Sequence, residues 1–254
     1  MNITIIGGLN WFGKGIIETT MNYKYFFNII DNCSSPNSCK SCFGEIQHLE
    51  DNYIIYYGNP KRQFRNIIKT SQFVIFNISS NKDIIKNQEI TNLFFETCLL
   101  CKEFDVKIIY ALDHDDFCNY YKNTMVNKLG CRYSCIQHNS NIIGKMKIRD
   151  KIEEIVYYLS IMNRVDIKNQ EFRYTTTTQV INTYLQALSV DGYLQLPYES
   201  INETSILYTI QNKLPKDKYL YYRVEPNDLK QTELCKQIVL EEYIYPLIYN
   251  YFRL

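Results

Sequence analysis

Residues 2–17 read Asn-Ile-Thr-Ile-Ile-Gly-Gly-Leu-Asn-Trp-Phe-Gly-Lys-Gly-Ile-Ile, and this stretch decides the fold class of the chain. A β-branched run ends at Gly7, and a run suited to a helix begins at Lys14. A strand that breaks on glycines and continues as a helix brings backbone N–H groups at the helix N-terminus against a pyrophosphate, where the helix dipole favours negative charge. The stretch therefore predicts a phosphate-binding turn between a first strand and a first helix.

The glycine pattern of this turn is altered at one position. The usual dinucleotide fingerprint has three glycines: one for the tight turn, one for close approach of the phosphate and one for packing of helix against strand. Gly7 and Gly13 stand at the first and third places, and Asn10 stands at the second. Because Asn adopts the left-handed conformation more readily than most residues, the altered loop still predicts phosphate binding. A glycine-rich surface turn is the alternative interpretation.

Beyond the turn, short apolar runs alternate with helical segments. Expected strands cover residues 26–31, 53–57, 73–78, 106–110 and 133–137, and expected helices cover residues 14–22, 62–70, 88–104 and 119–129. This alternation is typical of βαβ units and of a parallel sheet covered on both faces. We therefore predict an α/β fold, with a Rossmann-like doubly wound parallel sheet in residues 1–144. Residues 145–254 should form a smaller mixed C-terminal part that binds substrate or partner and packs on this core.

Composition favours a globular protein of the cytoplasm. The net charge is +1, and no apolar run approaches the ~18 residues of a membrane span. The chain opens directly on a strand, without the basic and apolar regions of a secretory signal. Nine cysteines, an odd number, favour reduced thiols over a disulfide framework. The charge does not favour nucleic acid as the main partner, but a basic stripe keeps RNA binding open, formed by Lys145, Lys147, Arg149 and Lys151.

Six segments, taken in order, resemble the extended short-chain dehydrogenase/reductase family, in its NAD-dependent epimerase/dehydratase group. The first resembles the family's strand and Gly-Gly-x-x-Phe-x-Gly turn, and the fifth resembles a strand that normally reads Arg-Pro-x-x-Ile-x-Gly. The segments are residues 5–14, 29–35, 57–59, 73–78, 135–144 and 172–188. The resemblance implies a Rossmann-like fold, NAD as cofactor, and substrates of the nucleotide-sugar type.

The resemblance and the turn together imply a dinucleotide site. Asp31 lies 18 residues after Gly13, close to the offset at which a carboxylate accepts the ribose hydroxyls of NAD. A carboxylate there would repel the 2′-phosphate of NADP, so we expect a preference for NAD. The alternative is that Asp31 only forms a turn with the Asn that follows it. The expected cofactor-binding residues are Gly7, Gly8, Asn10, Trp11, Phe12, Gly13, Asp31 and Asn59.

The catalytic positions of the family are poorly matched. Its members transfer a proton through a Tyr phenol whose pKa is lowered by a Lys four residues later, and a Ser or Thr near the end of the fifth strand orients the substrate. Alignment places Lys122 at the Lys position and Cys118 at the Tyr position. Ala111 and Leu112 fall in the hydroxyl region. We therefore expect a lost catalytic set. Cys118 acting as an acid or nucleophile is the alternative, since a nearby Lys lowers the pKa of a thiol.

A separate group of cysteines raises the question of zinc. The group comprises Cys33, Cys39, Cys42 and His48. The two-residue gap between Cys39 and Cys42 is that of zinc knuckles, but the other intervals are not diagnostic, and free thiols in a loop are the favoured alternative. Cys98 and Cys101 share this gap inside an apolar helix, where we expect core packing.

Three functions of different classes remain open from the sequence. The leading one is a degenerate dehydrogenase-like protein that acts as a binding or structural subunit without hydride transfer. The second is an active nucleotide-sugar epimerase, reductase or dehydratase that uses NAD. The third is an RNA-binding derivative of the same fold. A structural subunit would form a homodimer, or bind a protein partner, through the apolar helices expected at residues 88–104 and 119–129.

Overall fold

The structure is a computed structural model in which the chain forms two compact units. It describes residues 1–31, 43–57, 61–78, 84–113, 119–144, 151–162, 164–166, 171–213, 221–223, 244–249 and 251. The first unit contains Met1–Asn139 and Thr178–Leu196, and the second contains Ser140–Thr177 and Pro197–Leu254. The division expected at residues 144 and 145 differs from this one, because the chain returns to the first unit for residues 178–196.

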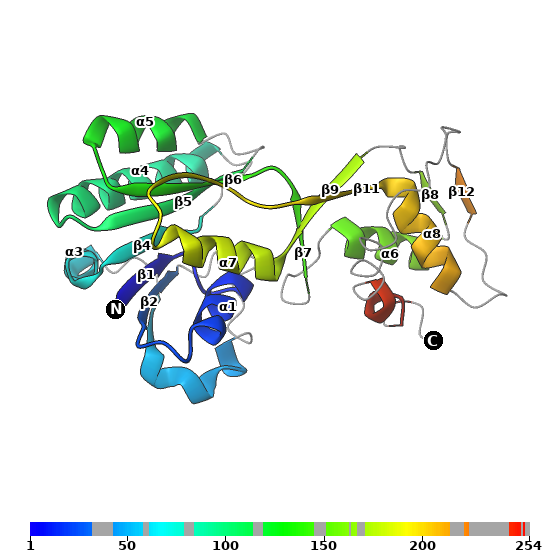
Figure 1. The fold of residues 1–254 in the computed structure, drawn as a ribbon, viewed down its shortest axis with the longest axis horizontal. Helices are drawn as coiled ribbons and strands as arrows, with labels where there is room; N and C mark the ends of the chain where they lie inside the picture. The colour runs from blue at the N-terminus through cyan, green and yellow to red at the C-terminus, as the bar shows by residue number, and fades with distance from the viewer. Residues whose placement is uncertain are drawn as a thin grey trace. The chain divides into compact units, whose positions relative to one another are not determined.

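A seven-stranded parallel sheet forms the centre of the first unit (Figure 1). Its order is β10-β6-β5-β4-β1-β2-β3, so the strand order reverses at β1, between β4 and β2. Ligands of open α/β sheets bind outside the carboxyl ends of the strands at such a reversal. The strands are β1 (Asn2–Ile6), β2 (Phe26–Asp31), β3 (Tyr53–Tyr57), β4 (Phe73–Phe76), β5 (Lys107–Asp113), β6 (Tyr133–His138) and β10 (Gly192–Gln195).

Helices cover both faces of this sheet, which confirms the predicted Rossmann-like class. On one face, α3 (Lys61–Thr70), α4 (Ile84–Glu103) and α5 (Asn119–Leu129) bury apolar side chains against β4, β5 and β6 in one cluster. On the other face, α1 (Trp11–Thr19) contacts α7 (Thr177–Ala187) through the edge-to-face rings of Phe12 and Tyr184 (Figure 1). The short helix η1 (Gln47–Asn52) precedes β3.

The second unit has a small mixed sheet of its own. Its order is β11-β9-β7, where β11 pairs antiparallel and β7 pairs parallel with the central strand β9. A further parallel pair joins β12 to β8. The elements are β7 (Asn141–Ile143), α6 (Lys151–Met162), β8 (Arg164–Asp166), β9 (Glu171–Thr176), β11 (Glu199–Asn202), α8 (Glu203–Lys213) and β12 (Tyr221–Arg223).

Most of the element positions agree with the sequence pattern. The third strand and the helix of residues 119–129 have the expected bounds, whereas α1 begins three residues before the expected Lys14, at Trp11. The edge strand β10 was not expected, since its four residues carry no long apolar run. No helix in the described part of the chain is long and apolar enough to cross a membrane.

Candidate functional site at the carboxyl ends of β1, β2 and β5

The glycine turn after β1 is packed too closely for side chains at two of its positions. Gly7 has a φ of +76°, and a Cβ there would lie 2.6 Å from Cγ1 of Ile78. A Cβ on Gly13 would lie 1.9 Å from the carbonyl oxygen of Gly8. The first glycine thus permits the sharp turn, and the third lets the start of α1 pack directly on the backbone that leaves β1.

Asn10 caps the helix that follows this turn. Its side-chain Oδ1 accepts hydrogen bonds from the N–H groups of Phe12 (3.0 Å) and Gly13 (3.4 Å), and its Nδ2 donates to the carbonyl of Gly7 (3.1 Å). Its φ of −154° is extended backbone. The left-handed conformation invoked from the sequence is therefore not used here, and Asn10 serves the turn through its side chain.

Asp31 joins the end of β2 to the same turn. Its Oδ2 accepts a hydrogen bond of 3.0 Å from the N–H of Leu9, and the residue is buried. The carboxylate lies beside the turn, because the carboxyl ends of the parallel strands β1 and β2 share one edge of the sheet. The bond to Leu9 also gives Asp31 a structural role that the sequence did not reveal.

Two aromatic residues of the turn have different surroundings. Phe12 is buried, packs edge-on against Tyr184 with ring centroids 4.5 Å apart, and Tyr184 in turn contacts the ring of His138. Trp11 is only half-buried. Phe12 is therefore a packing residue of the turn, while Trp11 is the aromatic side chain that remains accessible there.

A buried cation close to the turn escaped the sequence analysis. Lys14 follows Gly13 directly, and its side chain is buried. The ammonium forms ion pairs with Glu45 and, at 3.8 Å, with Glu18. In the sequence, the only indication of this cation is that a Lys directly follows the third glycine of the turn. The two carboxylates neutralise most of the positive charge that it would offer to a phosphate.

Lys122 of α5 extends its side chain to the carboxyl-terminal half of β5. It is buried, and its Nζ donates to the carbonyl oxygen of Ala111 at 3.4 Å. The neighbouring side chain on β5, Leu112, belongs to the apolar cluster beneath α4 and α5. The described end of β5 thus presents a methyl group and an apolar side chain where the family has its hydroxyl.

Two other titratable groups near Lys122 are held protonated. Burial raises the pKa of the Cys135 thiol to about 12, although Tyr110 and Lys122 act in the opposite direction. Burial likewise raises the pKa of Tyr110, whose hydroxyl donates to Oδ1 of Asn123 at 2.8 Å. Neither group exchanges a proton readily at neutral pH, so neither is suited to acid–base chemistry at this end of the sheet.

Several expected site residues lie outside the described part of the chain. They are Cys33, Cys39, Cys42, Asn59, Cys118 and the stripe Lys145, Lys147 and Arg149. His48 lies exposed on η1. Among the described residues, no group of three or more His, Cys, Asp or Glu side chains is placed to hold a metal ion. Cys98 and Cys101 are buried in the core, which confirms their packing role.

Solved structures that superpose on this chain include sugar-nucleotide epimerases and a dehydratase, several of them in complex with NAD. The Bordetella bronchiseptica enzyme WbmH in complex with NAD+ superposes with a TM-score of 0.70 at 13% identity, covering 99% of this chain and 98% of the other. The UDP-glucuronic acid 4-epimerase of Bacillus cereus gives 0.69 at 15% identity, covering 100% and 99%. The dTDP-glucose 4,6-dehydratase of Bacillus anthracis gives 0.70 at 12% identity, covering 100% and 96%.

These similarities concern the fold. No family model and no curated protein sequence matches the chain. The chain therefore has the fold of the NAD-dependent epimerases and dehydratases over its whole length, with identities so low that residue roles must be argued from its own side chains.

Proposed function

We propose that this chain is a degenerate dehydrogenase-like protein, which keeps the form of a dinucleotide site but transfers no hydride and acts as a binding or structural subunit. The observation that carries this proposal is the environment of Lys122. Its ammonium donates to the carbonyl of Ala111, and positions 111 and 112 of β5, where the family alignment puts a hydroxyl, are Ala and Leu.

The chemistry of hydride transfer explains why this environment matters. Removing a hydride from a sugar carbinol leaves a carbonyl, so the hydroxyl proton must leave to a group whose pKa lies near the working pH. Cys135, with its pKa raised to about 12, stays protonated at neutral pH and therefore cannot accept this proton. Burial raises the pKa of Tyr110 as well. The described residues near Lys122 thus supply no tuned acid–base group.

A retained dinucleotide site is supported by the arrangement of the turn and Asp31. The backbone at Gly7 and Gly13 is as close-packed as a phosphate turn requires, and Asp31 stands at the end of β2. In this proposal the turn would hold the pyrophosphate and Asp31 the adenine ribose. A bound NAD would supply a hydride acceptor, which in this proposal the chain no longer uses.

A hydride-transfer assay tests this proposal. Purified protein is incubated with NAD and, in turn, UDP-glucose, UDP-glucuronic acid and dTDP-glucose, and NADH absorbance and product are measured. We expect neither to rise above a protein-free blank. Turnover that disappears in Lys122→Ala would contradict the proposal and establish the alternative, an active nucleotide-sugar enzyme. Turnover that survives in Lys122→Ala would indicate a contaminant.

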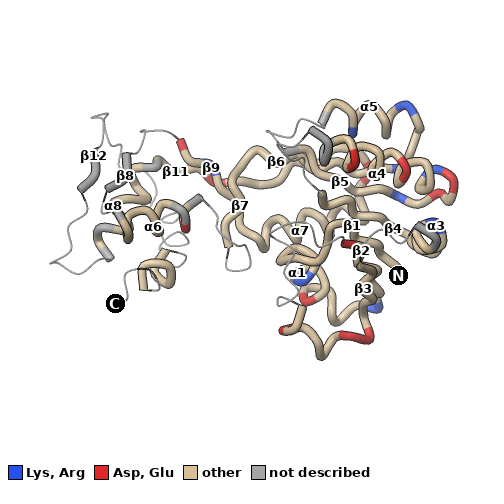
Figure 2. The backbone as a smooth tube through the Cα atoms, turned by 180° about the vertical axis from the view of Figure 1, so that it is seen from behind, with Lys and Arg blue, Asp and Glu red and all other residues tan. Residues whose placement is uncertain are grey.

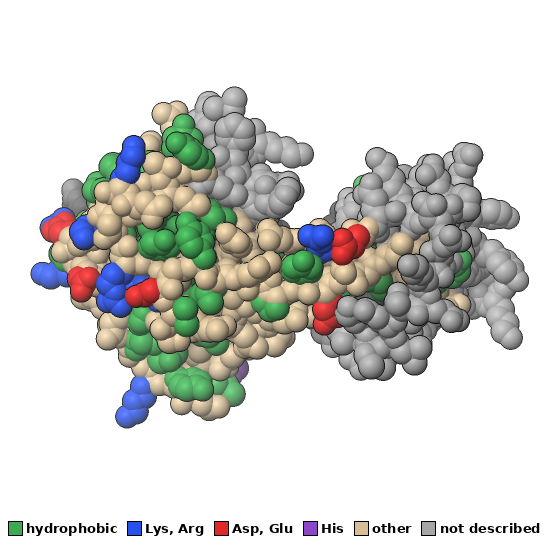
Figure 3. All heavy atoms as spheres, turned by 45° about the horizontal axis from the view of Figure 1, so that its top comes forward, with side chains coloured by type: hydrophobic (Ala, Val, Ile, Leu, Met, Phe, Trp, Pro, Cys, Tyr) green, Lys and Arg blue, Asp and Glu red, His purple; other side chains and the backbone are tan. Residues whose placement is uncertain are grey.

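The structural role is supported by apolar side chains exposed on α4 and α5. Figure 3 shows hydrophobic side chains on the surface of the unit that contains these helices. Those exposed on the two helices are Phe95, Leu99, Tyr120 and Tyr121. We propose that they form the interface of a symmetric homodimer, in which one patch on each copy contacts its equivalent.

RNA binding has less support. Lys, Arg, Asp and Glu lie interspersed over the described backbone of the first unit, as Figure 2 shows. A non-specific RNA site would need a continuous positive surface whose affinity falls steeply with salt. Binding of RNA to the protein at low salt that is lost at high salt would favour this third function.

A further inference from the structure

We propose that the side chain of Asn10 occupies the phosphate-binding position of the turn, so that the chain keeps its own pyrophosphate site closed. This inference rests on the proposed function, in which the turn retains the form of a dinucleotide site. It assigns Asn10 as the residue that sets the affinity for dinucleotides.

Two of the donors that a phosphate could use at this helix N-terminus are already bonded to Asn10. The first N–H groups of a helix have no partner within the helix, and they are the groups that an anion accepts from at a helix N-terminus. In α1, Oδ1 of Asn10 accepts from two of them, Phe12 N–H at 3.0 Å and Gly13 N–H at 3.4 Å. The carboxamide oxygen thus stands where a phosphate oxygen would.

Three further N–H groups of the turn also donate to protein oxygens. The N–H of Gly7 donates to the carbonyl of Ile30 at 2.8 Å, and the N–H of Asn10 donates to the carbonyl of Gly8 at 2.8 Å. The N–H of Leu9 donates to Asp31. These donors of the turn are therefore already engaged within the protein, as are the two that Asn10 caps.

The second hydrogen-bonding group of Asn10 stabilises this arrangement. Its Nδ2 donates to the carbonyl of Gly7 at 3.1 Å, so the carboxamide is held at both ends. A glycine at this position would leave the N–H groups available, as in the fingerprint. An incoming phosphate must first rotate the Asn10 side chain away, and loss of such a cap corresponds to about a tenfold change in an equilibrium constant.

Calorimetric titration of NAD into the wild-type protein and two variants of Asn10 tests the inference. Asn10→Ala removes the carboxamide while retaining Cβ, and we expect it to bind NAD about tenfold more tightly. Asn10→Asp retains an oxygen that can cap the helix but adds a negative charge, and we expect it to bind NAD more weakly than the wild type.

Two controls separate the phosphate effect from a general loss of stability. Adenosine, which has no phosphate, should bind wild type and Asn10→Ala equally. Asn202 caps α8 in the second unit by accepting from the N–H of Thr204 at 3.0 Å. Asn202→Ala should therefore lose a comparable cap, measured by thermal unfolding, without gaining affinity for NAD.

The outcomes are distinguishable from those of the proposed function. A folded Asn10→Ala that binds NAD no better than wild type overturns the inference. If only Asn10→Gly gains affinity, Cβ rather than the carboxamide excludes the phosphate, and the inference is again wrong. Should Asn10→Ala fail to fold, Asn10→Cys, which also retains Cβ and lacks the carboxamide, takes its place: tighter NAD binding supports the inference and unchanged binding overturns it. Hydride transfer by the wild type would contradict the proposed function alone.

Discussion

Gly13 leaves no room for a side chain, and this is the tightest contact of the turn. A Cβ would lie 1.9 Å from the carbonyl oxygen of Gly8, which belongs to the backbone and cannot rotate away. By contrast, Gly44 has no atom within 4 Å of such a Cβ. Close packing therefore requires a glycine at position 13 but not at position 44.

Gly13→Ala should destabilise the fold by about 2–3 kcal/mol, the range of overpacking, because the start of α1 must move away from β1. Gly44→Ala is the matched control, and we expect it to stay within about 0.5 kcal/mol of the wild type. Urea unfolding of both variants measures this. Equal stabilities of the two would contradict the close packing of the turn.

Asp31 combines a structural bond with a proposed ligand contact. In Asp31→Asn, the amide oxygen can still accept from Leu9, while the charge that would repel a 2′-phosphate is gone. We expect the preference for NAD over NADP to shrink or reverse, since that preference arises from charge. Titration of both dinucleotides in the Asn10→Gly background measures it. A wild type that already prefers NADP would show that the carboxylate does not face the ribose.

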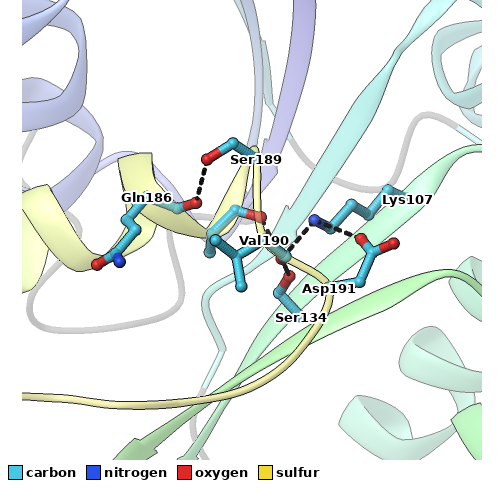
Figure 4. A network of polar contacts seen from close by, with 7 residues as sticks. Lys107, Ser134, Gln186, Ser189, Val190 and Asp191 are labelled. Atoms are coloured by element: carbon cyan, nitrogen blue, oxygen red, sulfur yellow. Dashed lines mark hydrogen bonds and ion pairs between the residues drawn. The ribbon is translucent and has the colours of Figure 1, made fainter.

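At the scale of elements, a network of polar contacts joins the end of α7 and the start of β10 to the amino ends of β5 and β6 (Figure 4). The buried Lys107 of β5 donates to the carbonyl of Val190 at 2.6 Å and pairs with Asp191 at 2.7 Å. From β6, the Ser134 hydroxyl donates to the carbonyls of Ala187 (3.1 Å) and Val190. These contacts bring residues 178–196 back to the central sheet.

The Lys107–Asp191 pair should make stability depend on pH in the acid range. The hydrogen bond from Lys107 holds the pKa of Asp191 below its usual value of 3.8. A depressed carboxyl pKa contributes stability above the unfolded pKa, and that contribution is lost as the pH falls through the lower folded pKa. We expect the free energy of unfolding to fall in this window, and to fall less in Asp191→Asn.

An exposed pair offers the control for this measurement. Arg173 and Glu171 form an ion pair at 3.0 Å with both side chains about half exposed. Salt screens such pairs, so Glu171→Gln should have a smaller effect that high salt abolishes. The contribution of Asp191 should persist better in salt because its partner Lys107 is buried. Identical salt responses of the two variants would refute this distinction.

At the scale of the whole molecule, assembly is the property that the proposed function most needs. Phe95 and Leu99 lie one helical turn apart on α4 and are exposed, while Phe94 and Cys98 of the same helix are buried in the core. When a second copy of the chain covers exposed apolar side chains on a helix, it removes them from water and so stabilises the assembly.

Phe95→Glu should convert a homodimer to a monomer, because two carboxylates would face each other across a symmetric interface. Met21→Glu, at a similarly exposed apolar residue that follows α1, is the matched control and should leave the mass unchanged. Light scattering at micromolar concentration measures both. A wild type that is already monomeric and captures no partner would count against the structural-subunit role.

The chain's sequence by itself determined the α/β class, the glycine turn and the approximate position of each strand as far as residue 138. Those features follow from local patterns, since alternating apolar runs and turn glycines act over a few residues. The return of residues 178–196 to the sheet was decided by tertiary contacts between residues distant in sequence, among them those of Lys107 and Ser134, the pairing of β10 with β6 and the packing of Tyr184 on Phe12. The same is true of the closed turn: the pattern shows an Asn at position 10, but only the folded chain brings its carboxamide to the N–H groups of α1.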